Sequence, residues 1–244
     1  MGPAFILQLL SYGLWFPLKI LGIAALLRVG VRRYPLIFIY SVATFLFAAA
    51  ELPLTLTYLG SGHGGVDRYR YFHWIEEGLT YVLILAVVIS LIYRATSKLL
   101  PRHIIRLALV AGGFLFITVS FLIHYDGKQQ LIGAWVTPWT RDLNVCAAIL
   151  DLALWGLLLR SRERDATLLL LTGGMGISFA GEAIGTSIRS VALLKKSMNL
   201  FLFGHAVMML ADAAFLYIWW QTFRREANRR NEPANASRVS SGNR

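Results

Sequence analysis

Ionisable side chains inside long apolar segments are the residues of this sequence best suited to chemistry. The candidate set consists of Glu51, Glu76, Asp151, Glu182 and His205. At a helical rise of about 1.5 Å per residue, they lie roughly 6–13 Å from the ends of their own segments, all toward one side. A carboxylate at mid-membrane costs at least about 2.5–3.5 kcal/mol, so such groups face a bundle interior or a water-filled cavity. The set therefore predicts an acidic cavity that binds a small ligand or protons.

Glu51 leads this set because it stands two residues before Pro53. Proline lacks an N–H, which frees a backbone carbonyl and kinks a helix, and a kink leaves room for a pocket. Glu182 comes next, in a glycine-rich segment. Small residues recur four apart in this segment, at Gly174 and Ser178 and at Gly181 and Gly185. Such spacing predicts close packing of two helix backbones.

Two positions in the set leave alternatives open. Glu76 and Glu77 are adjacent and point about 100° apart on a helix. One of them therefore faces the cavity, and the other reaches the membrane interface or Arg70. Asp151 shares a helix face with Asn144, seven residues earlier in the chain. This pair either lines the cavity or only hydrogen-bonds a neighbouring helix.

Lys19 and Asp212 are predicted to form a structural ion pair. Counted from the outer ends of the first and seventh apolar segments, both lie about 20 Å deep. An unpaired ammonium at that depth costs several kcal/mol, and pairing removes this cost. The pair would fasten the first helix to the last. The alternative is a protonated Asp212 that bonds a backbone carbonyl.

No metal site, cofactor or catalytic centre is predicted. A metal site needs three or four ligands in defined geometry, and neither an HxxxH nor an HExxH pairing occurs. His205, Glu51 and Glu182 would have to supply such a site from three separate segments. The sequence also lacks a Walker loop, a Rossmann glycine pattern, a serine elbow and a CxxC pair. We therefore expect a protein without enzymatic chemistry.

The composition favours a lipid bilayer as the surrounding of most of the chain. Of 244 residues, 57% are hydrophobic and 15% are charged, and the mean hydropathy is +0.58. These values leave too little polar surface for a soluble globule of this size. The pattern predicts an all-α, polytopic bundle of seven transmembrane helices. The predicted spans are about 5–27, 35–59, 72–93, 104–124, 142–159, 166–187 and 199–221.

Basic residues predict the orientation and the partners of this bundle. With the N-terminus outside, the cytoplasmic side carries 16 Lys and Arg residues and the outer side carries 7, as the positive-inside rule requires. Residues 224–244 are basic and poor in apolar side chains, which predicts a disordered cytoplasmic tail near anionic lipid. The net charge of +11 follows the loops, so nucleic acid is not an expected partner. No connection is long enough for a soluble domain, which favours a partner membrane protein.

One short motif resembles a known family. Residues 70–74, RYFHW, resemble the RYxxW start of the third helix in microbial rhodopsins, which are also seven-helix proteins with an outer N-terminus. Those proteins bind retinal on a lysine four residues after an aspartate in the last helix. Here Asp212 is followed at that spacing by Leu216, and residues 199–221 hold no lysine. A retinal Schiff base therefore cannot form at the position that the family uses.

A broader pattern resembles a group of uncharacterised bacterial seven-helix membrane proteins. It comprises RRYP at 32–35, YFHWIEEGL at 71–79, RDLN at 141–144 and the late glutamate of the sixth segment. This resemblance implies a multi-pass protein of the bacterial cytoplasmic membrane. With the acidic cavity, it favours a non-enzymatic ligand-binding or sensory protein. The alternatives are a small-solute or proton-coupled transporter, a membrane-embedded enzyme and a structural subunit.

Overall fold

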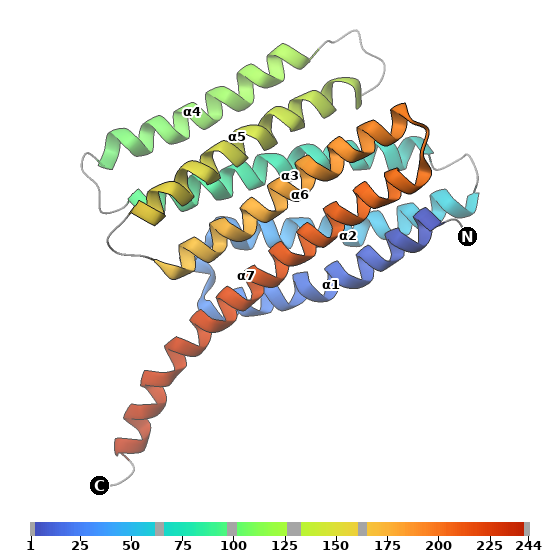
Figure 1. The fold of residues 1–244 in the computed structure, drawn as a ribbon. Coiled ribbons are helices and arrows are strands. Elements are labelled where there is room, and N and C mark those ends of the chain that lie inside the picture. Colours follow the sequence, from blue (N-terminus) through green and yellow to red (C-terminus); the bar gives the residue numbers. More distant parts are fainter. Residues whose placement is uncertain (1–2, 62–65, 97–101, 126–132, 161–164, 242–244) are drawn as a thin grey trace. The chain divides into compact units, whose positions relative to one another are not determined.

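The chain folds into long α-helices in a computed structural model that describes residues 3–61, 66–96, 102–125, 133–160 and 165–241. These residues form α1 (Pro3–Val29), a 3₁₀ turn η1 (Val31–Arg33), α2 (Pro35–Ser61), α3 (Val66–Ala95), α4 (Arg102–His124), α5 (Gly133–Arg160), α6 (Ala166–Leu194) and α7 (Met198–Ser241), as Figure 1 shows. All seven α-helices of the described residues are long and apolar enough to cross a membrane. The prediction of an all-α chain with seven such helices is confirmed.

Two helices, α5 and α7, extend furthest beyond their predicted spans. α5 begins at Gly133 instead of residue 142, and it includes Pro138. A proline near a helix start removes only one backbone hydrogen bond, and Trp135 and Trp139 hold this turn through edge-on ring contacts with Phe121. α7 continues to Ser241, through most of the segment predicted to be a disordered tail.

One compact unit comprises residues 1–38 and 162–244. Within it, α7 lies beside both α6 and α1 (Figure 1), so the predicted packing of the first helix against the last is confirmed. The α6–α7 contact is very close, because a Cβ placed on Gly181 would overlap Ala211. Trp219 of α7 also donates from Nε1 to the Leu171 carbonyl of α6 at 3.0 Å. Small residues therefore bring two backbones together, as predicted.

The other compact unit comprises residues 39–161. Within it, α3 and α4 both contact α5. The buried stripe of α5 follows the helical repeat and contains Val136, Thr140, Leu143, Ala147, Asp151, Leu154 and Leu158. α4 instead turns large apolar side chains outward, with Leu107, Phe114 and Ile123 each more than 70% exposed. Such a face suits contact with lipid.

Gly185→Ala should lower the thermal stability of the detergent-purified protein, and Gly173→Ala should not. A Cβ on Gly185 would lie 2.7 Å from the backbone oxygen of Gly204, so the helices must shift at a cost of about 1–3 kcal/mol. A Cβ on Gly173 meets nothing within 4 Å, and alanine favours a helix interior by about 1 kcal/mol over glycine. Melting curves followed by circular dichroism measure both changes. Equal melting temperatures for the two variants would contradict the close contact.

Candidate functional site

Three potential ligand groups converge between α2 and α3. Glu51 of α2 and His73 and Glu76 of α3 each offer one atom, and these atoms all lie within 4.8 Å of one another. His73 Nδ1 lies 3.8 Å from Glu51 Oε1. His73 and Glu76 are three residues apart and so share one helix face. We call Glu51, His73 and Glu76 the donor cluster.

Aromatic neighbours hold the donor cluster in place. The Tyr69 hydroxyl donates to Glu51 Oε1 at 3.3 Å, which orients the carboxylate. The Tyr69 ring also stacks on the His73 imidazole, with 6.0 Å between ring centroids and 8° between planes. The Trp74 ring lies beside the same imidazole, with 5.4 Å between the ring centroids. Tyr69 and His73 are one helical turn apart, so α3 itself positions both the imidazole and the hydroxyl.

The donor cluster is partly enclosed and rich in negative charge. The Glu51 side chain is 15% exposed, whereas the His73 side chain is 45% exposed. Two ionised carboxylates within 4.8 Å repel by about 3 kcal/mol at an effective dielectric constant of about 20. A cation between them, or a proton on one of them, removes this repulsion. The cluster is therefore suited to bind positive charge.

Glu77 faces a different helix from Glu76. Its Oε1 accepts a hydrogen bond from the Thr140 hydroxyl of α5 at 3.1 Å. The predicted divergence of these adjacent carboxylates is therefore present in the structure. Glu76 belongs to the donor cluster, which also includes Glu51 of α2. Glu77 bonds α5, whereas the predicted alternatives for it were the membrane interface and Arg70.

Asp151 lies deep in the buried stripe of α5. The residue is 2% exposed, and its Oδ1 has no hydrogen-bond partner among the described residues. The Oδ1 atom of Asn144, two turns earlier, is also buried and also has no hydrogen-bond partner among the described residues. The predicted Asn144–Asp151 pair therefore shares the buried face, and neither of these two oxygens bonds a neighbouring helix among the described residues.

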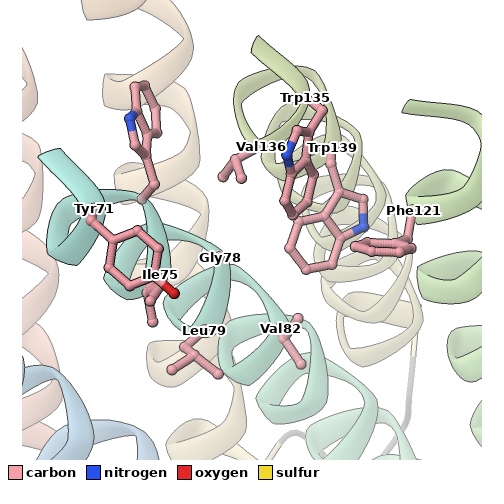
Figure 2. Close-up of a pocket in the computed structure, with 10 residues that line it drawn as sticks. Tyr71, Ile75, Gly78, Leu79, Val82, Phe121, Trp135, Val136 and Trp139 are labelled. Atoms are coloured by element: carbon pink, nitrogen blue, oxygen red, sulfur yellow. The ribbon is translucent and has the colours of Figure 1, made fainter. Parts of the chain in front are cut away.

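An aromatic pocket adjoins the first half of α3 on a different face from the donor cluster. Its volume is about 340 Å³, and Figure 2 shows α3 on one side and α5 on the other. Trp135 and Trp139 of α5 and Phe121 of α4 form one wall, and Tyr71 and Ile75 of α3 form the facing wall. The lining is almost wholly apolar, so the pocket suits a hydrocarbon group rather than an ion.

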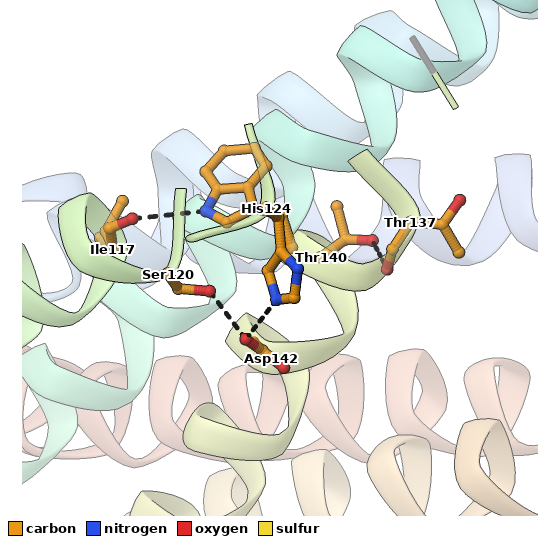
Figure 3. Close-up of polar contacts among 7 residues, drawn as sticks. Ile117, Ser120, His124, Thr137, Thr140 and Asp142 are labelled. Carbon is orange, nitrogen blue, oxygen red and sulfur yellow. Dashed lines mark hydrogen bonds and ion pairs between the residues drawn. The ribbon is translucent and has the colours of Figure 1, made fainter. Parts of the chain in front are cut away.

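A second polar group joins α4 to α5. Asp142 Oδ2 accepts a hydrogen bond from the Ser120 hydroxyl at 2.9 Å and lies 2.9 Å from His124 Nε2, as Figure 3 shows. The Asp142 side chain is 44% exposed. These contacts satisfy the carboxylate locally, so we assign the group to helix packing. Sequence reasoning did not single out Asp142 or His124.

Glu182, His205, Lys19 and Asp212 belong to the unit of α1, α6 and α7. Glu182 and His205 are half-buried, and Arg189 lies within electrostatic range of His205. Asp212 Oδ1 accepts a hydrogen bond from the Ser178 hydroxyl at 2.7 Å, and Lys19 lies within electrostatic range of Asp212. A single cavity shared by all five candidates stays a prediction, as does the Lys19–Asp212 ion pair.

Sequence reasoning missed an ion pair at the other end of this unit. Arg33 Nη1 lies 2.5 Å from Glu226 Oε1, and the Tyr34 hydroxyl donates to Glu226 Oε2 at 3.1 Å. Glu226 is 8% exposed, and Phe223 beside it is fully buried. These contacts explain why α7 continues past residue 223. The sequence feature that could have indicated this ion pair is Glu226, the single acid in the basic run RREANRR at 224–230.

Comparison with known proteins found no relative of this chain. The chain matches no family model, no curated protein and no solved structure.

Lys19→Met and Asp212→Asn should each lower the thermal stability of the purified protein, and the double variant should regain much of the loss. Removing one partner of a buried ion pair leaves an uncompensated charge and costs about 3–5 kcal/mol. Ser178→Ala serves as a control, because it removes one hydrogen bond from Asp212 at a cost of about 1 kcal/mol. Chemical or thermal denaturation measures all four variants. Additive losses for Lys19 and Asp212 would rule out the pair.

Proposed function

We propose that this chain is a multi-pass protein of a bacterial cytoplasmic membrane that binds a small cation at the donor cluster. The observation that carries the proposal is the convergence of Glu51, His73 and Glu76 within 4.8 Å, in two helices that are long and apolar enough to cross a membrane. A negative cluster in such a surrounding is costly unless it faces positive charge or water. The protein acts as a ligand-binding sensor without enzymatic chemistry.

The cation enters from the outer side, and the N-terminus lies outside. The excess of basic residues on the opposite loops supports this orientation. The donor cluster lies about 10–15 Å from the ends of α2 and α3 that the connection 62–65 joins. His73 is 45% exposed, which supports access from that end. The basic tail contacts anionic lipid, and the signal passes to a partner membrane protein.

A proton-coupled carrier is the second candidate function. The observation that favours it is Asp151, a buried acid whose Oδ1 has no hydrogen-bond partner among the described residues. An ionisable group of this kind inside a membrane marks a proton or solute pathway. The acid lies about three turns beyond Thr140 along α5, and Thr140 bonds Glu77 of α3, so protons would pass along the buried stripe of α5. Proton uptake into proteoliposomes that Asp151→Asn abolishes would favour the carrier over the sensor.

A membrane-impermeant thiol reagent added to whole cells should label Glu51→Cys in a Cys146→Ala background. The reagent reaches this position only if the donor cluster opens outward. Leu85→Cys is the matched control, because Leu85 of α3 is fully buried and should stay unlabelled. A methylammonium salt tests occupancy, and it should slow the labelling of His73→Cys, in which both carboxylates remain.

A third cysteine separates the two ways in which this result can fail. Gly64→Cys lies in the connection between α2 and α3 and reports orientation alone. If Gly64→Cys is labelled and Glu51→Cys is fully protected, the donor cluster is packed and the proposed binding site is wrong. If Gly64→Cys stays unlabelled in whole cells and reacts only after lysis, the proposed orientation is wrong.

A further inference from the structure

We infer that Glu51, His73 and Glu76 bind a divalent first-row transition-metal ion, for which Zn²⁺ is the probe. This inference rests on the proposed function and names the cation that the donor cluster takes. No metal site is predicted from the sequence, because His73 and Glu76 pair with Glu51 only through the way in which α2 and α3 pack. The cluster is instead assembled from two helices.

The chemistry of the donors selects the class of metal. Two carboxylate oxygens and one imidazole nitrogen form a mixed oxygen–nitrogen set. Mg²⁺ and Ca²⁺ prefer oxygen ligands alone, and Ca²⁺ takes six to eight of them. Imidazole together with carboxylate suits zinc, iron and similar divalent ions. Two carboxylates also balance the charge of a divalent ion, which a site inside apolar helices requires.

The geometry is close to that of a three-ligand site. Ligand atoms around one tetrahedral zinc lie about 3.4 Å apart, since each metal–ligand bond is about 2.1 Å. His73 Nδ1 and Glu51 Oε1 are already 3.8 Å apart, and every pair in the cluster lies within 4.8 Å. Rotation of the long glutamate side chains closes the remaining distance without backbone movement. The metal joins α2 to α3.

Groups around the cluster fit the support that metal ligands need. Ligating carboxylates are commonly oriented by a second hydrogen bond. The Tyr69 hydroxyl supplies one to Glu51, and the Tyr69 ring stacks on His73. The half-exposed imidazole leaves one side of the site open. Three protein ligands with an open position suit exchange of a water or a small ligand on the metal.

A primary ammonium is the main rival occupant. Three acceptors around an ammonium lie about 4.6 Å apart, at donor–acceptor distances of about 2.8 Å. The 3.8 Å between His73 and Glu51 is shorter than this spacing, and it favours the smaller metal ion. The His124–Asp142 pair is the rival location. It offers only two ligating groups, and Ser120 already bonds its carboxylate.

Equilibrium dialysis with Zn²⁺ tests the inference on the detergent-purified full chain. The protein carries Cys146→Ala and a purification tag without histidine, so that neither binds zinc. We expect one zinc ion per chain. Glu51→Gln, His73→Gln and Glu76→Gln should each weaken binding at least tenfold. Tyr69→Phe keeps all three ligands and should weaken binding about tenfold through lost orientation.

Two control variants and one competing ion test whether zinc binding is specific to the donor cluster. Glu77→Gln removes a carboxylate that bonds Thr140 and lies within electrostatic range of His73, so it should weaken zinc binding less than the loss of a ligand does. Asp142→Asn removes the rival location and should bind zinc within about twofold of the parent protein. A hundredfold excess of Mg²⁺ should leave the zinc bound. Melting curves without zinc confirm that every variant is folded.

Several outcomes would overturn the inference. The first is that the folded parent protein binds no zinc. The second is that only Asp142→Asn, and none of the donor-cluster variants, loses zinc binding. The third is that the hundredfold excess of Mg²⁺ displaces the bound zinc. Slowed labelling of His73→Cys by methylammonium, together with no zinc binding, would keep the proposed cation site and reject the metal. Zinc binding to the cluster, with Glu51→Cys inaccessible from outside, would keep the metal and reject the outward opening.

Discussion

An apolar surrounding penalises every polar group that lacks a partner, and this constraint organises both units. The backbone meets it by forming helices, which bond their own N–H and C=O groups. Side chains meet it by hydrogen-bonding to a different element of the fold. The pairs are Tyr34 with Glu226, Ser178 with Asp212, Tyr69 with Glu51, and Thr140 with Glu77. Each pair satisfies two polar groups and also selects which helix faces meet.

The donor cluster differs from the other pairs because it brings two carboxylates together around one imidazole. Tyr69 supplies one hydrogen bond to Glu51, but a hydroxyl cannot balance two carboxylates. Glu77, one residue away, shows the ordinary solution, in which a single threonine hydroxyl on the next helix bonds the acid. The adjacent glutamates on α3 therefore differ in their surroundings: Glu76 converges with Glu51 and His73, whereas Glu77 bonds Thr140 of α5.

Much of the fold could be predicted from the sequence, whereas the composition of the cluster could not. Apolar length alone indicates the seven helices, and the four-residue spacing of glycines in α6 indicates its close contact with α7. The divergence of Glu76 and Glu77 follows from helix geometry. His73 could not be assigned to Glu51, because that contact depends on how α2 and α3 rotate about their axes. The start of α5 and the continuation of α7 depend on tertiary contacts of Trp135 and Glu226, which local composition does not encode.

Anomalous diffraction from a crystal grown with zinc tests the central claim most directly, because it locates the ion without relying on a variant. We predict an anomalous peak between the Glu51, His73 and Glu76 side chains, about 2.1 Å from one ligand atom of each. Density confined to the His124–Asp142 pair, with Glu51 and Glu76 turned apart, would contradict it.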